Sequence, residues 1–107
     1  MIPVVDLSKS DNLYKVSDPI IAQENAYKYL GRNATLYKSS QKSKKYAIFN
    51  ENGKAIHFGD INHQDFTKHG NLQRRINYLC RSKNIKVDWK DNPYSRNNLS
   101  RYILWNL

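Results

Sequence analysis

The chain has 107 residues and carries 18 Lys and Arg against 9 Asp and Glu, a formal net charge of +9. Its length suits one domain, and a hydrophobic content of 39% is enough for one core, which excludes a wholly disordered basic tail. No stretch approaches the roughly 20 apolar residues of a membrane span, and residues 1–10 lack the pattern of a signal peptide. Cys80 is the only cysteine, which excludes an internal disulfide and a thiolate zinc site. We expect a soluble protein that is made in the cytosol and is not secreted.

The charge is unevenly distributed along the chain. Residues 1–27 contain two Lys against four acidic residues, a net charge of −2, so residues 28–107 carry +11. Residues 1–16 have apolar side chains without a sustained period, and we expect them to form an extended N-terminal arm. Residues 17–107 are expected to form a single basic domain.

A helix is predicted between Asp18 and Gly31. Asp18 is a polar cap, Pro19 suits the first turn, and Gly31 is a typical stop. Ala22 and Ala26 lie one turn apart, and their small side chains favour close packing against a sheet.

The clearest local signal lies in residues 45–59, where two alternating apolar segments flank a turn that contains glycine. This pattern predicts a β-hairpin, to which residues 34–37 can add a third strand. The alternation places four large apolar side chains on one face of the pair: Tyr46, Ile48, Ile56 and Phe58.

A second helix is predicted over residues 72–83, with Asn71 as its cap. Apolar residues recur at i, i+4, i+7 and i+8 and are expected to form its buried stripe: Leu72, Ile76, Leu79 and Cys80. Cys80 is then a small buried hydrophobe. The opposite side carries Arg74, Asn77, Tyr78 and Arg81, and we expect Tyr78 to be the most exposed aromatic residue.

The last part of the chain has weaker signals. Ile85, Val87 and Trp89 alternate, which fits a short strand or an exposed extended segment. Ser95 follows Pro93 and can cap a last helix. The aromatic residues expected mainly in the core are Phe49, Phe58, Trp89 and Trp105. The fold class is therefore α+β, a small domain in which a β-hairpin or three-stranded antiparallel sheet packs against two or three short helices.

Positive side chains gather in two groups, one before the hairpin and one over the helix at 72–83. The candidates for contact with a polyanion are Lys42, Lys44, Lys45, Arg74, Arg75, Tyr78, Arg81 and Lys83. Such a surface attracts DNA or RNA through the phosphate backbone, largely without regard to sequence, or attracts an acidic protein. The alternative interpretation is a solvated face that only keeps the protein soluble.

One polar stretch, residues 60–69, is the place where a catalytic or metal site is conceivable. Asp60, Asp65, His63 and His69 supply carboxylates and imidazoles, but their spacing matches no established ligand set. Asp65 is more readily explained as a cap for backbone N–H groups, and His69 as a residue that holds a loop. No phosphate-binding glycine loop or nucleophile motif is present. We predict no catalytic residue, no metal, no cofactor and no small-molecule ligand.

Three short blocks carry a resemblance to a known family: HFG at 57–59, DFTKH at 65–69 and LSRYILW at 99–105. Together they resemble small uncharacterised proteins of large eukaryotic DNA viruses of the phycodnavirus and mimivirus kind, with looser relatives in tailed phages. The resemblance spans residues 36–105, and its marker residues here are His57, Phe58, Gly59, Asp65, Phe66, His69, Tyr102 and Trp105. The chain departs from the family pattern at Gly70 and Asn71, where relatives tend to have an acidic residue, and at 80–82, where they have a more basic run.

The resemblance implies a viral gene product without an assigned reaction. Small basic proteins of such viruses are often virion components, so the leading hypothesis is a non-enzymatic minor capsid or core component. It would bridge other virion or capsid proteins through its basic surface and N-terminal arm, in the virion and, before assembly, in the host cytoplasm or viral factory. The alternatives are a sequence-independent nucleic-acid-binding protein of replication or packaging and, less favoured, a nucleic-acid-processing enzyme.

Overall fold

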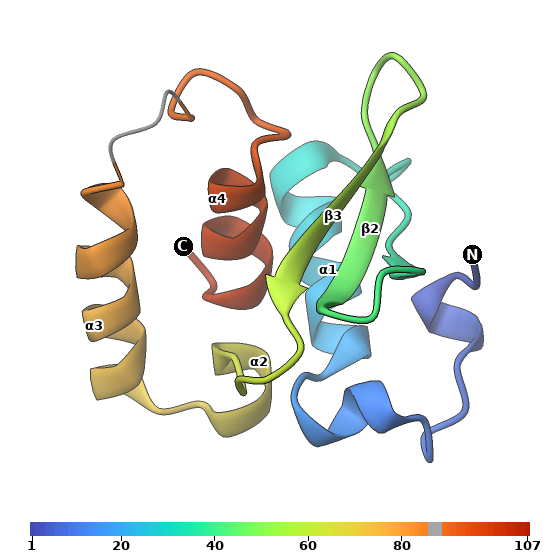
Figure 1. The fold of residues 1–107 in the computed structure, drawn as a ribbon, viewed down its shortest axis with the longest axis horizontal. Coiled ribbons are helices and arrows are strands. Elements are labelled where there is room, and N and C mark those ends of the chain that lie inside the picture. Colours follow the sequence, from blue (N-terminus) through green and yellow to red (C-terminus); the bar gives the residue numbers. More distant parts are fainter. Residues whose placement is uncertain (86–88) are drawn as a thin grey trace.

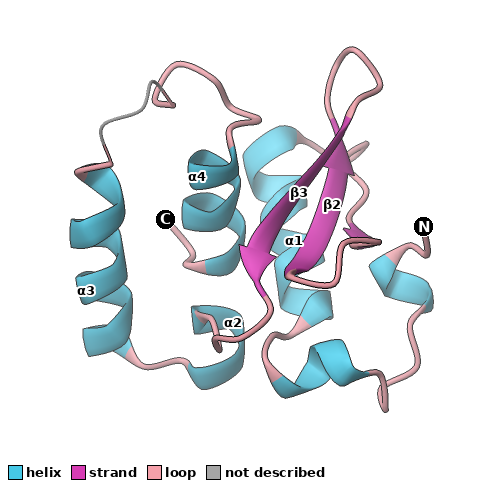
Figure 2. Ribbon diagram, in the orientation of Figure 1, coloured by secondary structure: helices cyan, strands magenta, loops and turns pink. Residues whose placement is uncertain are grey.

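A computed structural model describes residues 1–85 and 89–107. The elements follow in the order η1 (Val4–Asp6), η2 (Asn12–Lys15), α1 (Pro19–Leu30), β1 (Tyr37–Lys38), β2 (Lys44–Phe49), β3 (Ala55–Asp60), α2 (Phe66–His69), α3 (Leu72–Lys83), α4 (Arg96–Leu99) and η3 (Ser100–Leu104). Here η1 and η2 are 3-10 helices and η3 is one π-helical turn that continues α4 (Figure 2). The mixture of a three-stranded sheet with short helices confirms the predicted α+β class. The short strand considered at residues 85–89 falls largely outside the described residues.

The sheet is antiparallel with the order β1-β2-β3. Its register confirms the predicted hairpin face, because Tyr46 pairs with Phe58 and Ile48 pairs with Ile56. The turn between the strands contains Gly53 in the left-handed region, with φ of +77°. This hairpin supplies two of the largest fully buried side chains, Tyr46 and Phe58.

Helix α1 forms where the sequence predicts it. The Asp18 carboxylate accepts hydrogen bonds from the N–H groups of Ile20 and Ile21 at 3.0 and 3.3 Å, and Gly31 ends the helix with φ of +101°. Ala22 and Ala26 are fully buried, as expected for a helix that closely approaches its neighbours. In Figure 1, α1 lies behind the β2–β3 hairpin.

The C-terminal helices separate the sheet from α3. Both α4 and η3 pack against β3, and η3 also packs against α1. In Figure 1 they stand between the hairpin and α3, which forms the outer edge of the molecule. The core therefore sits where the hairpin, α1 and η3 meet, and α3 is attached from one side.

The N-terminal segment differs from the predicted extended arm, because residues 1–16 fold onto the domain. The N–H of Val4 donates to the carbonyl of Leu36 at 3.0 Å, and the N–H of Lys38 donates to the carbonyl of Ile2 at 2.9 Å. Val4 and Leu13 are at most 1% exposed and belong to the core cluster. Its 3-10 turns are too short to show a period in the sequence, which is why the packing was not predicted.

Helix α3 has the predicted bounds, but most of its predicted buried stripe is exposed. Three of the four residues of the predicted buried stripe face outwards, since Leu72 is 65% exposed, Ile76 is 51% exposed and Cys80 is exposed. The fourth, Leu79, is partly buried and packs against the core cluster as predicted. The side that packs contains Ser82, which is buried, and Tyr78, which is half-buried. The helix is therefore fixed by aromatic stacking, by hydrogen bonds to the C-terminal segment and by Leu79, and most of the aliphatic stripe takes no part.

Candidate anion-binding cleft

A cleft of about 790 Å³ lies between α3 on one side and β3 with α4 on the other. Side chains from β2, β3, α3, α4 and η3 line it, together with Trp89 and Trp105. Its deepest residues are apolar, since Phe58 and Leu104 are at most 1% exposed. Such a volume falls in the range of ordinary ligand sites in proteins.

Five Lys and Arg residues of the described chain line the cleft, of which Lys45 is buried. The other four are Lys44 of β2, Arg74 and Arg81 of α3, and Arg96 of α4. The three arginines are exposed, and Lys44 is half-buried. Among the described residues, none of the four lies within 4.0 Å of a carboxylate. We call these four residues the cationic rim. Asp60 is the one acidic residue of the described lining, and its carboxylate faces His63 at 3.6 Å.

Arg96 is the one member of the cationic rim that was not predicted from the sequence. Arg96 follows the cap residue Ser95 at the start of α4, and its Nε donates to the carbonyl of His57 at 2.9 Å. That bond anchors the guanidinium to β3 across 39 residues of sequence. No local pattern around Arg96 signals such a contact, because it depends on how α4 meets the hairpin.

Lys45 was predicted to contact a polyanion, and the structure shows that this prediction is wrong. Its side chain is 2% exposed, and its Nζ lies 3.1 Å from Oδ2 of Asp65, which is 1% exposed. Burial lowers the pKa of the Lys45 ammonium, and the neighbouring Asp65 carboxylate opposes that shift. Lys45 therefore lines the cleft with almost no exposed surface, and its charge is already paired with Asp65.

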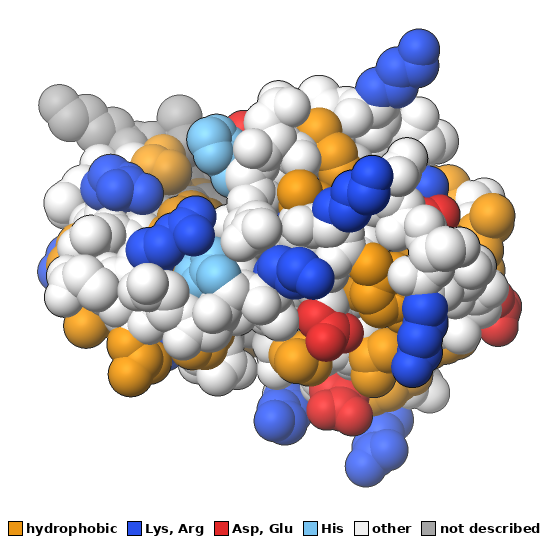
Figure 3. All heavy atoms as spheres, turned by 90° about the horizontal axis from the view of Figure 1, so that it is seen from below, with side chains coloured by type: hydrophobic (Ala, Val, Ile, Leu, Met, Phe, Trp, Pro, Cys, Tyr) orange, Lys and Arg blue, Asp and Glu red, His pale blue; other side chains and the backbone are white. Residues whose placement is uncertain are grey.

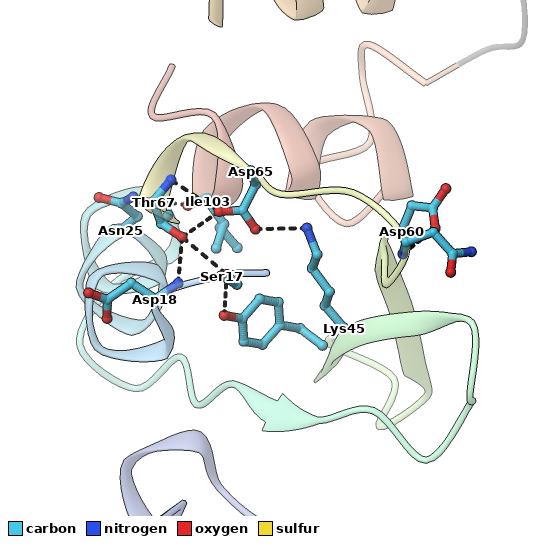
Figure 4. Close-up of polar contacts among 10 residues, drawn as sticks. Ser17, Asp18, Asn25, Lys45, Asp60, Asp65, Thr67 and Ile103 are labelled. Carbon is cyan, nitrogen blue, oxygen red and sulfur yellow. Dashed lines mark hydrogen bonds and ion pairs between the residues drawn. The ribbon is translucent and has the colours of Figure 1, made fainter. Parts of the chain in front are cut away.

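Asp65 is the centre of a buried polar cluster (Figure 4). Its Oδ1 accepts hydrogen bonds from the N–H of Thr67 at 3.0 Å and from the Thr67 hydroxyl. The hydroxyl of Ser17 lies 3.1 Å from that of Thr67 and 2.6 Å from that of Tyr46. This buried polar cluster, formed by Ser17, Lys45, Tyr46, Asp65 and Thr67, joins the segment before α1 to β2 and to the start of α2.

The aromatic residues around the cleft are largely used for internal packing. Tyr78 was expected to be exposed, but its ring stacks on Trp105 with centroids 4.2 Å apart, and burial raises the pKa of its hydroxyl. Trp89 is 7% exposed, and the Arg101 guanidinium lies 5.4 Å from its ring centroid. Phe58, Trp89 and Trp105 are buried as predicted, whereas Phe49 is 44% exposed. These rings therefore offer little free surface on which bases could stack.

The other predicted basic residues lie outside the cleft. Arg75 holds the C-terminal segment, because its Nε and Nη2 donate to the carbonyls of Trp105 and Asn106, each at 2.9 Å. Lys42 and Lys83 are exposed but do not line the cleft. Of the eight predicted polyanion contacts, the structure places Lys44, Arg74, Tyr78 and Arg81 at the cleft, with Lys45 buried beneath it.

Three of the residues that mark the sequence resemblance, Phe58, Gly59 and Trp105, line the cleft, and others pack close to it. Gly59 has φ of +84°, and a Cβ there would lie 2.9 Å from Cδ1 of Leu104. Nδ1 of His69 accepts from the N–H of Asn71 at 2.9 Å, and its ring lies 5.3 Å from that of Trp105. Nε2 of His69 is buried without a hydrogen-bond partner among the described residues, and burial lowers its pKa.

The remaining marker residues also make internal contacts. His57 Nδ1 lies 2.7 Å from the hydroxyl of Ser39. The ring of Tyr102 stacks on that of Tyr29 with centroids 4.2 Å apart, and Phe66 packs against the core cluster. These contacts explain the marker residues as structural ones.

The acidic and imidazole residues of the polar stretch are not brought together as a hydrolytic site. Asp65 bonds to Lys45 and Thr67, while Asp60 lies apart from the buried polar cluster in Figure 4. His63 faces Asp60, and His69 bonds to Asn71. Within residues 1–85 and 89–107, no three potential His, Cys, Asp or Glu ligands gather around one point.

The surface as a whole is cationic. On the underside of the molecule, Lys and Arg side chains are spread across the face and outnumber Asp and Glu (Figure 3). What distinguishes the cleft is that its cations converge on a concave, apolar space. In the described part of the chain, no helix has the length and apolar character needed to cross a membrane.

Residues 34–82 match a family of unknown function (DUF5754). The match covers the whole sheet, α2 and nearly all of α3, so it includes three of the four rim residues and the buried polar cluster apart from Ser17. The chain is similar to that family over this part. Neither a curated protein nor a solved structure matches the chain.

Proposed function

We propose that this protein is a non-enzymatic, sequence-independent nucleic-acid-binding protein that holds a phosphate backbone in the cleft. The observation that carries the proposal is the cationic rim: Lys44, Arg74, Arg81 and Arg96 face one concave space with no carboxylate within 4.0 Å among the described residues. Unpaired cations attract phosphates, and binding releases the counterions condensed on the nucleic acid.

The positions of the rim residues support a linear ligand. Arg74 and Arg81 lie two turns apart on α3, about 10 Å along the helix axis at 1.5 Å per residue. Lys44 and Arg96 stand on the opposite side. A phosphate backbone that follows the cleft would thus pass between cations on both sides. Because the aromatic rings are packed against one another, they would make few contacts with the bases, and binding would depend little on sequence.

Virion association stays a prediction from the resemblance of the sequence. The N-terminal segment packs onto the core through Val4 and Leu13. It is therefore not the free arm that the bridging hypothesis requires. The cationic rim does not depend on it, and for this reason the nucleic-acid proposal now comes first.

The test is a binding titration with fluorescently labelled oligonucleotides of unrelated sequence, followed by anisotropy at several salt concentrations. For duplex DNA, the slope of log affinity against log salt changes by about 0.9 for each phosphate contact. We expect similar affinities for all sequences, and a weaker affinity with a shallower slope for the Arg74→Ala, Arg81→Ala double variant.

The matched control is the Lys9→Ala, Lys15→Ala double variant, which removes the same charge from exposed residues outside the cleft. It should bind nearly as well as the wild type, because only the rim contacts phosphates directly. Equal losses in the two double variants would mean that net charge alone attracts the nucleic acid, and would reject the cleft as the site.

A further inference from the structure

The outer side of α3 carries an apolar stripe that no described part of the chain covers. Leu72 is 65% exposed, Ile76 is 51% exposed, and Cys80 is exposed. These residues stand at i, i+4 and i+8, so they form one line along two turns of the helix, about 12 Å long. In Figure 3, hydrophobic side chains are exposed at the lower left, on the side that carries α3.

This stripe is separate from the cleft. None of Leu72, Ile76 and Cys80 lines the cleft, whereas Arg74 and Arg81 of the same helix do. Ser82 and Tyr78 lie on the packed side of the helix. Helix α3 therefore presents cations to the cleft on one side and aliphatic side chains to solvent on another.

The segment that carries the stripe has charges of one sign only. Residues 66–85 contain five Lys and Arg and no Asp or Glu. Among these, Lys68 and Lys83 are exposed near the two ends of α3. A second copy of this chain would bring an equally positive helix against it, and like charges in an interface oppose association. Charge complementarity therefore favours an acidic partner.

We propose that the outer face of α3 is a docking site for one acidic amphipathic helix of a partner protein. The partner's aliphatic side chains would cover Leu72, Ile76 and Cys80, and its Asp and Glu would face Lys68 and Lys83. This is the helix-on-helix mode in which anchors at i, i+4 and i+8 give affinity and flanking charges set the choice of partner.

An anionic membrane is the other acidic surface that a basic, partly apolar helix can meet. Interfacial helices carry a broad apolar face, commonly with Trp or Phe, that enters the headgroup region. The stripe of α3 has no aromatic residue and only two large aliphatic ones, which suits a narrow helix seam better than insertion between lipids.

The docking site stands independently of the nucleic-acid proposal, because its residues and its chemistry differ. If both hold, the two ligands occupy different sides of α3 and can bind together, so the protein would link a nucleic acid to an acidic partner.

Cys80 offers a direct test, because the only cysteine of the chain lies on the stripe. The probe is a synthetic helical peptide with a leucine seam flanked by glutamates, and the measurement is the rate of Cys80 alkylation by a maleimide. We expect the peptide to slow alkylation several-fold, and the same peptide with lysines in place of the glutamates to leave the rate unchanged. Absence of protection by the acidic peptide overturns the proposal.

The matched variants are Leu72→Gln, Ile76→Gln on the stripe and Ile2→Gln, Val5→Gln at exposed aliphatic residues elsewhere. Loss of one aliphatic contact should weaken peptide binding about tenfold, so the first double variant should lose about a hundredfold, while the second should bind like the wild type. Circular dichroism checks that both remain folded. The Lys44→Ala, Arg96→Ala variant should still be protected, which separates the stripe from the cleft.

Two outcomes contradict the docking site. Protection that persists in the Leu72→Gln, Ile76→Gln variant would show that the peptide binds elsewhere. Protection of Cys80 by vesicles of phosphatidylserine and phosphatidylcholine, without protection by the acidic peptide, would assign the stripe to a membrane surface.

Discussion

Lys44 and Lys45 are neighbours in β2 and belong to two different regions of the molecule. Lys45 is 2% exposed and paired with Asp65 in the buried polar cluster, whereas Lys44 stands half-buried at the cationic rim with no carboxylate beside it among the described residues. Successive side chains of a strand point to opposite faces, which separates the two. A count of positive residues thus does not measure the charge that a ligand meets.

The two regions also differ in what their polar groups require. The buried polar cluster satisfies its own hydrogen bonds, so any change leaves a buried charge or donor without a partner. The arginines of the cationic rim are exposed and Lys44 is half-buried, so replacing Lys44, Arg74 or Arg81 should cost little stability. Arg96 differs, because it also bonds to the carbonyl of His57. Changes to the cluster should therefore act on stability, and changes to the rim should act on binding.

The largest expected effect comes from Asp65→Asn. It leaves the Lys45 ammonium buried without a counterion, and breaking a buried pair typically costs about 3–5 kcal/mol of unfolding free energy. Asp60→Asn is the matched control, since its carboxylate is 55% exposed, and should change stability by less than about 0.5 kcal/mol. Denaturant unfolding measures the free energy of unfolding of both variants. Equal losses would show that the buried pair stabilises the fold no more than an exposed carboxylate does.

The second effect concerns the glycine that lets β3 approach η3. Gly59→Ala adds a Cβ 2.9 Å from Cδ1 of Leu104 at a positive φ, and overpacking of a core typically costs about 1–3 kcal/mol beyond the backbone strain. Gly53→Ala also has a positive φ but meets open space, so it should cost only the strain of about 1–2 kcal/mol. The close approach would be refuted if both variants had the same thermal stability.

A smaller effect is a loss of stability below pH 6.5. Burial lowers the pKa of His69 in the folded protein, whereas the unfolded chain keeps the ordinary value of 6.5. The unfolded state then binds more protons as the pH falls, so stability is full above 6.5 and is lost as the pH drops through the folded pKa. His69→Asn should flatten this part of the melting-temperature profile, and an unchanged slope would assign the loss to other groups.

Local signals predicted the local structure. Asp18 and Gly31 mark the ends of α1, Asn71 marks the start of α3, and alternation gives the register of Tyr46 and Phe58 across the hairpin. Each of these depends on residues close in sequence or on a two-residue period. The α+β class follows from them.

Contacts across the sequence decided what could not be predicted. Tyr78 stacks on Trp105, which turns Tyr78 inwards and leaves Leu72 and Ile76 facing solvent. Arg96 joins the rim through the carbonyl of His57 in a distant strand. Lys45 is not part of the rim because its ammonium pairs with Asp65, the cap residue of α2. The sequence therefore identified the basic elements, while their tertiary packing selected which cations remain available.

The most direct test of this account compares Lys44→Gln with Lys45→Gln in both unfolding and nucleic-acid binding. Lys44→Gln should unfold like the wild type but bind the labelled oligonucleotide more weakly, with a salt slope shallower by about 0.9 on duplex DNA. Lys45→Gln should instead lose stability, because Asp65 is left buried without its counterion, and should keep the wild-type salt slope under conditions where it is folded. A Lys44→Gln variant with unchanged affinity and slope, or a Lys45→Gln variant of wild-type stability, would contradict the division between a binding rim and a structural cluster.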